Sequence, residues 1–407
     1  MLELDIERLR LNRKGKESFV TNEKIGVMSL LICGVLLFIC SLEGVEYGFK
    51  LMFSDWANLI LSMVESGAAP FISLAVGVIA TTLLESSSAV IATTMMSMAG
   101  MVESGLPLSS AILFGIPMVM GANIGTTVGN TLTLFAIRKS TTREEFNSTI
   151  PGVIVDDICK FLTVGLLFPL EVTTGFLSKT VTTLGSFIYK ILKLERVLPV
   201  FEETVIDILI KDPIIEPMGK AFTDFFGPRL GGIFFSALWF AMVVISIDFF
   251  ITKGLKKLVR TDWAGRVSSA FGSPYKSFAT GFSITWVTGS SSIGTSLVIP
   301  IIATRMVTLE EAYPYICGCS IATTVDLAQI YGYIAGGVVG IMLGLAHVVL
   351  NILALMLWLV SPLRVLPIRI ANGIGGFMSS KRYSALLLLG YAFSIFILIP
   401  LIVIFVL

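Results

Sequence analysis

Charged residues are scarce in this sequence. Asp, Glu, Lys and Arg make up 14% of its 407 residues, whereas hydrophobic residues make up 55%. The mean hydropathy is +0.89. A soluble globular protein of this length carries a much larger share of charged residues on its surface. The composition therefore excludes an ordinary soluble protein and indicates that lipid surrounds most of the chain.

Histidine and cysteine are also rare, with one His and five Cys in the chain. No two cysteines have the spacing of a metal site or of a disulfide framework, so we interpret them as packing residues. His347 stands alone in an apolar stretch, where a hydrogen-bonded structural role is favoured over proton relay. The net charge of +1, without a long basic run, gives no reason to expect a nucleic-acid partner.

Long apolar stretches recur along the chain, and each is long enough to cross a hydrocarbon core of about 30 Å. Spanning segments must satisfy their backbone hydrogen bonds internally, which predicts helices, and the alternating pattern of a transmembrane barrel is missing. We therefore predict an all-α polytopic membrane protein. The stretches lie near 26–42, 70–100, 108–137, 150–170, 230–252, 277–303, 333–361 and 382–407.

The N-terminal segment is polar and basic. The apolar stretch after it lacks the small-residue cleavage site of a signal peptide, so we expect it to be a membrane anchor. Its positive charges precede the first apolar stretch, so the positive-inside rule places this end in the cytoplasm of a multi-pass cell-membrane protein. These charges belong to Arg8, Arg10, Arg13, Lys14, Lys16 and Lys24.

Three features occur twice in the same order, which predicts an internal duplication. Asp55-Trp56-Ala57 returns as Asp262-Trp263-Ala264, and the triplet Ser86-Ser87-Ser88 returns as Ser290-Ser291-Ser292. The third repeated feature is the segment 121–128, which corresponds to 318–325. Each feature alone is a weak signal, but their shared order favours two homologous halves.

The basic clusters indicate that the two halves are inserted in opposite directions. In the first half the basic cluster precedes the helix expected at 26–42. In the second half Lys253, Lys256 and Lys257 follow the corresponding helix, expected at 230–252. If both clusters are cytoplasmic, the chain is an inverted repeat. We expect a cytoplasmic segment 1–24, repeat 1 at 25–183, an external linker at 184–227, repeat 2 at 228–380 and a C-terminal helix at 381–407.

The Ser triplets interrupt apolar stretches, which is typical of secondary transporters with a site near the membrane midplane. Each stretch can form a re-entrant helical hairpin with the serines at its tip, where free backbone N–H groups and hydroxyls bind an anion. The Ser/Thr clusters contain no Lys or Arg of their own, so a buried anion needs an accompanying cation, and sodium is the obvious candidate. Packing alone does not require the same triplet in both halves.

The chain resembles the type II sodium-coupled phosphate cotransporters. Members carry Gln-Ser-Ser-Ser and Gly-Ser-Asn-Ile-Gly-Thr in both repeats, which the two triplets and Gly121 to Thr126 match. The resemblance implies sodium-driven uptake of inorganic phosphate, without a cofactor, between the two Ser-rich motifs. We expect phosphate ligands at Ser86, Ser87, Ser88, Asn123, Gly125, Ser290, Ser291 and Ser292. We expect sodium ligands at Glu85, Thr126, Thr127, Ser290, Ser320, Thr323, Thr324 and Asp326.

Several positions depart from the family pattern. Glu85 and Gly289 replace both glutamines, and Asp326 stands where the first half has Gly129. Glu85 either supplies charge to a cation site or takes part in its protonated form, which would make uptake pH-sensitive. Thr141-Thr142-Arg143 replaces a Gly-Asp-Arg run of electrogenic members, which puts a third sodium site in doubt. The final helix of animal members is shortened or missing here, so we expect the C-terminus outside.

Other interpretations stay open. The substrate can be another small oxyanion, and the sequence does not separate a carrier from an ion channel. A hydrolase using serine and His347 is disfavoured, because no Gly-x-Ser-x-Gly elbow is present. Asp156, Asp157 and Lys160 have the spacing of a neutralised pair within one helix, although Asp157 can approach an ion path.

Overall fold

The computed structural model describes residues 26–37, 68–103, 106–192, 212–246, 268–326 and 336–406, with single residues between 40 and 51 and between 329 and 333. Every regular element in these ranges is a helix, which confirms the all-α prediction. The basic N-terminus, both Asp-Trp-Ala motifs and the basic cluster at 253–266 lie outside the described residues.

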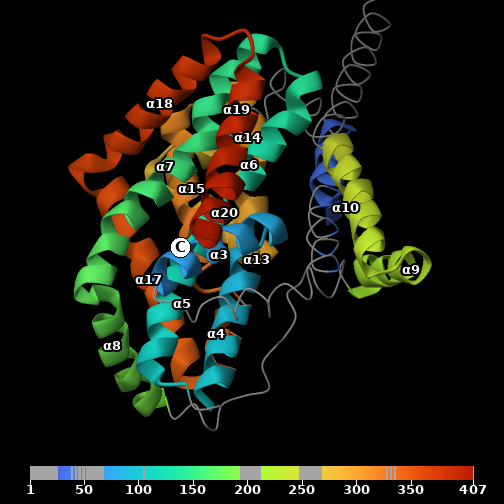
Figure 1. The fold of residues 1–407 in the computed structure, drawn as a ribbon. Helices are drawn as coiled ribbons and strands as arrows, with labels where there is room; N and C mark the ends of the chain where they lie inside the picture. Colours follow the sequence, from blue (N-terminus) through green and yellow to red (C-terminus); the bar gives the residue numbers. More distant parts are fainter. Residues whose placement is uncertain are drawn as a thin grey trace, which may run out of the picture.

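Figure 1 shows the described helices in chain order. Those before the predicted linker are α3 (Ala69–Leu84), α4 (Ser87–Glu103), α5 (Leu108–Gly125), α6 (Val128–Ala136), η2 (Ile137–Lys139), α7 (Arg143–Thr174) and α8 (Phe176–Leu192). The next helices along the chain are α9 (Glu216–Phe226), α10 (Pro228–Ile245), α13 (Pro274–Thr288), α14 (Ser291–Ala303), α15 (Leu309–Ala322) and α17 (Gly337–Leu355). The chain continues with η6 (Met356–Val360), η7 (Pro362–Arg364), α18 (Val365–Ser379), α19 (Ser384–Phe393), η8 (Ser394–Leu398) and α20 (Ile399–Val406).

Within the described ranges, three helical stretches are long and apolar enough to cross a membrane: Leu108–Lys139, Gly337–Val360 and Ser384–Val406. Shorter apolar helices cover further predicted stretches, among them Ala69–Leu84 and Ser291–Ala303. The predicted span 150–170 lies inside the 32-residue helix α7. Helix α8 continues past residue 183, and α9 lies inside the segment expected to be a linker.

Local sequence explains where the long helices begin and end. Thr142 and Glu145 form a capping box that starts α7, and Thr308 and Glu311 form a second one that starts α15. Helix α7 ends at Gly175, whose φ of 63° is the left-handed conformation that glycine adopts without strain. These caps satisfy backbone groups that a helix end otherwise leaves unpaired.

Two close helix crossings depend on glycine and recur in both halves. Helix α3 packs along α5, and a side chain on Gly77 would collide with the Met118 carbonyl oxygen. Helix α13 packs along α15 in the same way, and a side chain on Gly281 would collide with the Tyr315 carbonyl oxygen. Gly77 and Gly281 each lie nine residues before the first serine of a triplet. The duplicated sequence thus produces a duplicated packing contact.

The two halves also exchange contacts. Helix α6, from the first half, packs on α14 of the second half. In return, Gly332 of the second half lies against Ala92 and Met95 of α4, in the first half. Each triplet-bearing helix is therefore covered by a segment of the other half.

The N-terminal helical segment, α9 and α10 pack together at one side of the molecule (Figure 1). The rings of Tyr47 and Phe235 lie 6.1 Å apart in an edge-on contact, and Phe222 of α9 packs edge-on to Phe235. The Ser triplets lie outside this group, at the helices α4 and α14 of the larger body.

Candidate functional site

The helices break at both Ser triplets, where the sequence predicts an interruption. Helix α3 ends at Leu84 and α4 begins at Ser87. Of the two residues between them, Glu85 has a left-handed φ of 50°. Helix α13 ends at Thr288, and Gly289 follows with a left-handed φ of 69°. Glu85 and Gly289 therefore hold the same backbone conformation, although only glycine adopts it at no steric cost.

The first serine of each triplet caps the helix that follows. Ser86 Oγ accepts a hydrogen bond from the Ala89 N–H at 3.2 Å, and Ser290 Oγ accepts one from the Ile293 N–H at 3.4 Å. This is the usual role of serine at a helix N-terminus. All six triplet serines are buried, with exposures of 2–9%. The N-termini of α4 and α14 thus lie inside the protein with hydroxyls around them.

Two further breaks carry the threonine segments. Helix α5 gives way to α6 at Thr126 and Thr127, and α15 ends before Thr323. Thr126 donates to the Ala122 carbonyl oxygen at 3.1 Å, and Thr323 donates to the Ser320 carbonyl oxygen at 2.8 Å. The hydroxyl oxygens keep free lone pairs, which can serve as cation ligands.

All four breaks meet in one buried polar network that joins the halves. Ser292 donates to the Glu85 carbonyl oxygen at 2.8 Å, and the distance from its Oγ to the Thr126 carbonyl oxygen is 3.2 Å. From the opposite direction, Ser88 donates to the Asp326 carboxylate. The third serine of each triplet therefore bonds to a break in the other half.

The network extends from Asp326 to His347. Asp326 accepts from the Gln329 N–H at 2.9 Å, and Gln329 donates from its amide to the Ser88 carbonyl oxygen at 3.0 Å. The Gln329 amide oxygen lies 3.2 Å from His347 Nδ1. His347 is fully buried, so this contact agrees with the hydrogen-bonded structural role favoured from the sequence.

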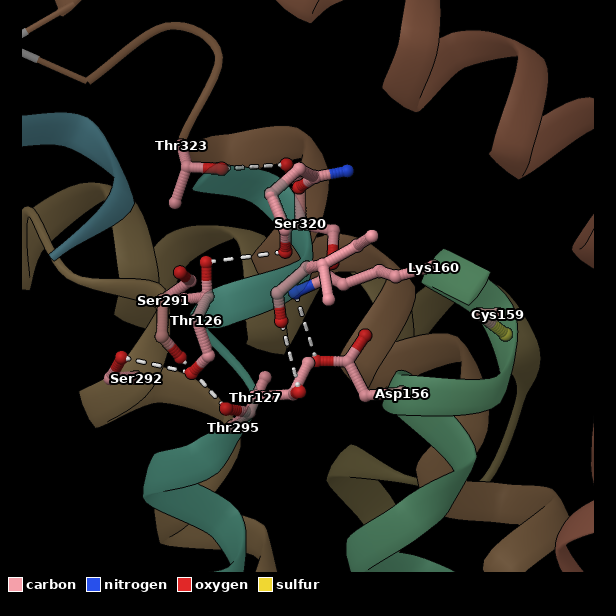
Figure 2. A network of polar contacts seen from close by, with 12 residues as sticks. Thr126, Thr127, Asp156, Cys159, Lys160, Ser291, Ser292, Thr295, Ser320 and Thr323 are labelled. Carbon is pink, nitrogen blue, oxygen red and sulfur yellow. Dashed lines mark hydrogen bonds and ion pairs between the residues drawn. The ribbon is translucent and has the colours of Figure 1, made fainter. Parts of the chain in front are cut away.

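Lys160 lies closer to the predicted anion ligands than the sequence suggested. Its Nζ is 3.2 Å from Asp156 Oδ2, and both side chains are almost fully buried. This ion pair lines a cavity of about 30 Å³ together with Asn123 and Ser320. A cavity of that size holds a water molecule or a small ion. Figure 2 shows Ser320, Thr126 and Thr127 between the α14 serines and the Lys160–Asp156 pair.

The remaining cavity wall is tied together by hydrogen bonds. Trp358 Nε1 donates to Thr163 Oγ1 at 2.8 Å, and the Tyr313 hydroxyl donates to the Trp358 carbonyl oxygen at 2.9 Å. Cys159 Sγ lies 3.0 Å from the Tyr313 hydroxyl. All five cysteines are free thiols. Asp157 takes no part in the Lys160 pair and accepts instead from the Tyr391 hydroxyl at 2.9 Å.

The predicted site residues separate into three groups. Ser88 contacts Asp326, and Ser292 contacts the backbone of Glu85 and Thr126. Asn123 and Ser320 meet Lys160 at the cavity. Gly125 has a packing role, because a side chain there would meet the Val78 carbonyl oxygen at 2.5 Å. The sequence reasoning did not include Ser296 or Lys160 among the site residues. The spacing of Ser296, four residues after Ser292 on α14, could have shown it, whereas Lys160 reaches Asn123 and Ser320 only in the folded chain.

The matching family model and the similar known proteins indicate the same family. The model of the Na+/Pi-cotransporter family matches residues 37–155 and 242–396. Sodium-dependent phosphate transport protein 2A of Ovis aries is 27% identical over 91% of this chain and 66% of its own length. Sodium-dependent phosphate transport protein 2B of Homo sapiens is 26% identical over 93% of this chain and 64% of its own length. The chain thus spans about two thirds of these relatives. No solved structure matches it.

Proposed function

The chain belongs to the Na+/Pi-cotransporter family, and from that membership we propose that it carries inorganic phosphate into the cell together with sodium. The relatives are named as sodium-dependent phosphate transport proteins, which supports a carrier over the hydrolase alternative. Transport proceeds by alternating access, in which the site opens to one side of the cell membrane at a time.

The observation that carries this proposal is the meeting of four helix breaks in one buried polar network. Ser292 bonds to the breaks at Glu85 and Thr126, and Ser88 bonds to Asp326 across the halves. Interrupted helices at a repeat interface suit the binding of an anion and a cation in the same place. Phosphate accepts from the N-termini of α4 and α14 and from the triplet hydroxyls. The threonine segments, Glu85 and Asp326 provide oxygen ligands for sodium.

Lys160 brings a charged hydrogen-bond donor to this site as half of an ion pair with Asp156. A phosphate ion is costly to bury without neutralising charge. Lys160 lines the same cavity as Asn123 and Ser320, so one fixed cation lies beside the proposed anion ligands. Because Asp156 cancels the charge of Lys160 overall, Lys160 contributes a hydrogen-bond donor for the anion, and sodium supplies the neutralising charge.

The proposed architecture is an inverted repeat with the bounds expected from the sequence and with a hairpin around each triplet. The repeated glycine crossings of α3 on α5 and of α13 on α15 support two equivalent halves. The near-equal breaks before Ser87 and Ser291 support equivalent hairpins. The basic N-terminus faces the cytoplasm in this arrangement.

Uptake of labelled phosphate into proteoliposomes tests the proposal. We expect uptake with an inward sodium gradient and little uptake when choline replaces sodium. Ser291→Ala should reduce uptake, whereas Ser109→Ala, at an exposed position of α5, should not. Flux that does not depend on the sodium gradient would indicate a channel. Preference for sulfate over phosphate would indicate another oxyanion as substrate.

A further inference from the structure

Two buried carboxylates at the helix breaks, those of Glu85 and Asp326, belong to different halves and stand at different positions of the repeat. Glu85 precedes the first triplet, where the second half has Gly289. Asp326 follows the second threonine segment, where the first half has Gly129. In the aligned halves each acid therefore stands opposite a glycine, so each half contributes one of these two acids but from a different place in the repeat.

The folded chain places the Glu85 carboxylate beside Gly129. A Cβ atom built on Gly129 would lie 3.8 Å from Glu85 Oε2, 3.5 Å from Ser296 Oγ and 3.5 Å from Ser292 Cβ. These are ordinary van der Waals distances, so a side chain at 129 has room, unlike one at Gly77. The Glu85 carboxylate thus borders the space that a side chain at 129 would enter.

The second half shows a similar arrangement, but its carboxylate belongs to the residue after the threonine segment and not to the residue before the Ser triplet. Asp326, the counterpart of Gly129, accepts a hydrogen bond from Ser88, the third serine of the first triplet. Glu85 and Ser292, the third serine of the second triplet, border the same space beside Gly129. Each third serine therefore has a carboxylate of the opposite half nearby.

Ser296 shows that the space beside Gly129 is suited to a ligand. Its side chain is completely buried, and its hydroxyl has no hydrogen-bond partner in the structure. A buried hydroxyl without a partner is costly, and a bound cation would satisfy its lone pairs. The Thr126 carbonyl oxygen lies 3.2 Å from the Oγ of Ser292, whose Cβ borders the same space, so it is a further oxygen near that space.

We propose that Glu85, Ser296 and the Thr126 carbonyl oxygen form a sodium site, and that Glu85 there replaces the missing acid at position 129. The inference rests on the proposed sodium-coupled function and names the ligands of one ion. The site is the first-half counterpart of the Asp326–Ser88 contact, with its carboxylate supplied from the residue before the triplet.

Moving the carboxylate tests this assignment. In Glu85→Gly the left-handed backbone is retained, because glycine prefers that conformation. We expect the sodium concentration for half-maximal phosphate uptake to rise about tenfold or more, as is typical when a cation site is damaged. The double variant E85G/G129D, which copies the second-half pattern, should return to within about threefold of the unaltered protein. E85G/G129N, of equal size but without charge, should stay impaired.

A second measurement does not depend on transport. Sodium chloride, compared with choline chloride, should raise the melting temperature of the purified protein, less so in Glu85→Gly and Ser296→Ala. Should Glu85→Gly fail to fold, Glu85→Gln is measured in its place. Unchanged sodium dependence in the single variants, or equal rescue by G129N and G129D, would overturn the assignment. Absence of sodium-dependent uptake in the unaltered protein would instead refute the proposed function, while sodium stabilisation still tests the site.

Discussion

Lys160 shows how one residue alters the electrostatics expected from the sequence. From its spacing it forms a neutral pair with Asp156, and the 3.2 Å contact agrees with that expectation. Its place beside Asn123 and Ser320 could not be deduced, because these residues come from three different helices. The pair holds the Lys160 ammonium in position beside Asn123 and Ser320.

Replacing Lys160 by Met should raise the KM for phosphate about tenfold or more, because a charged hydrogen-bond donor beside the anion is lost. The same change leaves Asp156 buried without its partner, which costs about 3–5 kcal/mol of stability. Phosphate uptake at saturating sodium and thermal unfolding in detergent measure the two effects.

The double variant D156N/K160M separates these effects, since it removes both charges. We expect most of the lost stability to return while the KM for phosphate stays high. A return of the KM to its original value would mean that the pair is only structural.

At the scale of elements, the glycine crossings decide how closely α3 approaches α5. Gly77→Ala should destabilise the protein by about 1–3 kcal/mol, because the added Cβ meets the Met118 carbonyl oxygen and the helices must separate. Gly165→Ala is the matched control, since nothing lies within 4 Å of a Cβ at that exposed position of α7. Melting temperatures of the two variants should differ clearly, and equal values would contradict the crossing.

The end of α14 offers a change in the opposite direction. Arg305 has a φ of 58°, a conformation that costs energy for any residue except glycine. Its ion pair with Glu144, at 2.7 Å, is exposed and therefore adds little stability. Arg305→Gly should raise the melting temperature, whereas Arg305→Ala, which keeps the strain and loses the pair, should not. A lower melting temperature for Arg305→Gly would show that the ion pair is the larger effect.

Sequence patterns predicted the elements better than their partners. Apolar stretches and the Ser triplets gave the helices and the breaks at 85–86 and 289–290, since these follow from local residues. The glycine crossings were not predicted, although Gly77 and Gly281 keep the same distance from the triplets. The packing of α6 on α14 was not predicted either. A sequence repeat does not show whether a helix packs within its own half or against the other half.

At the scale of the whole molecule, basic residues gather at one end of the helices. Arg143 donates to the Lys381 carbonyl oxygen at 3.2 Å, and Arg305 pairs with Glu144 at the start of α7. Arg138 and Lys139 end the candidate span Leu108–Lys139 nearby. The positive-inside rule assigns this end to the cytoplasm, in agreement with the proposed orientation.

Cysteine labelling tests that orientation. Ser140→Cys should react with a membrane-impermeant maleimide only from the cytoplasmic side, and Pro107→Cys, at the other end of the same span, only from outside. The unaltered chain is the control for its own five cysteines. Labelling with the two sides reversed would overturn the orientation and would leave the internal packing unaffected.

The exchange of α6 onto α14, and of Gly332 onto α4, bears on the ancestry of this fold. Each helix that carries a Ser triplet is covered partly by its own half and partly by the other half. A single ancestral half would therefore have made the second set of contacts only with an identical copy of itself. Gene fusion then allowed the two copies to diverge, and the two acids, Glu85 and Asp326, are a mark of that divergence.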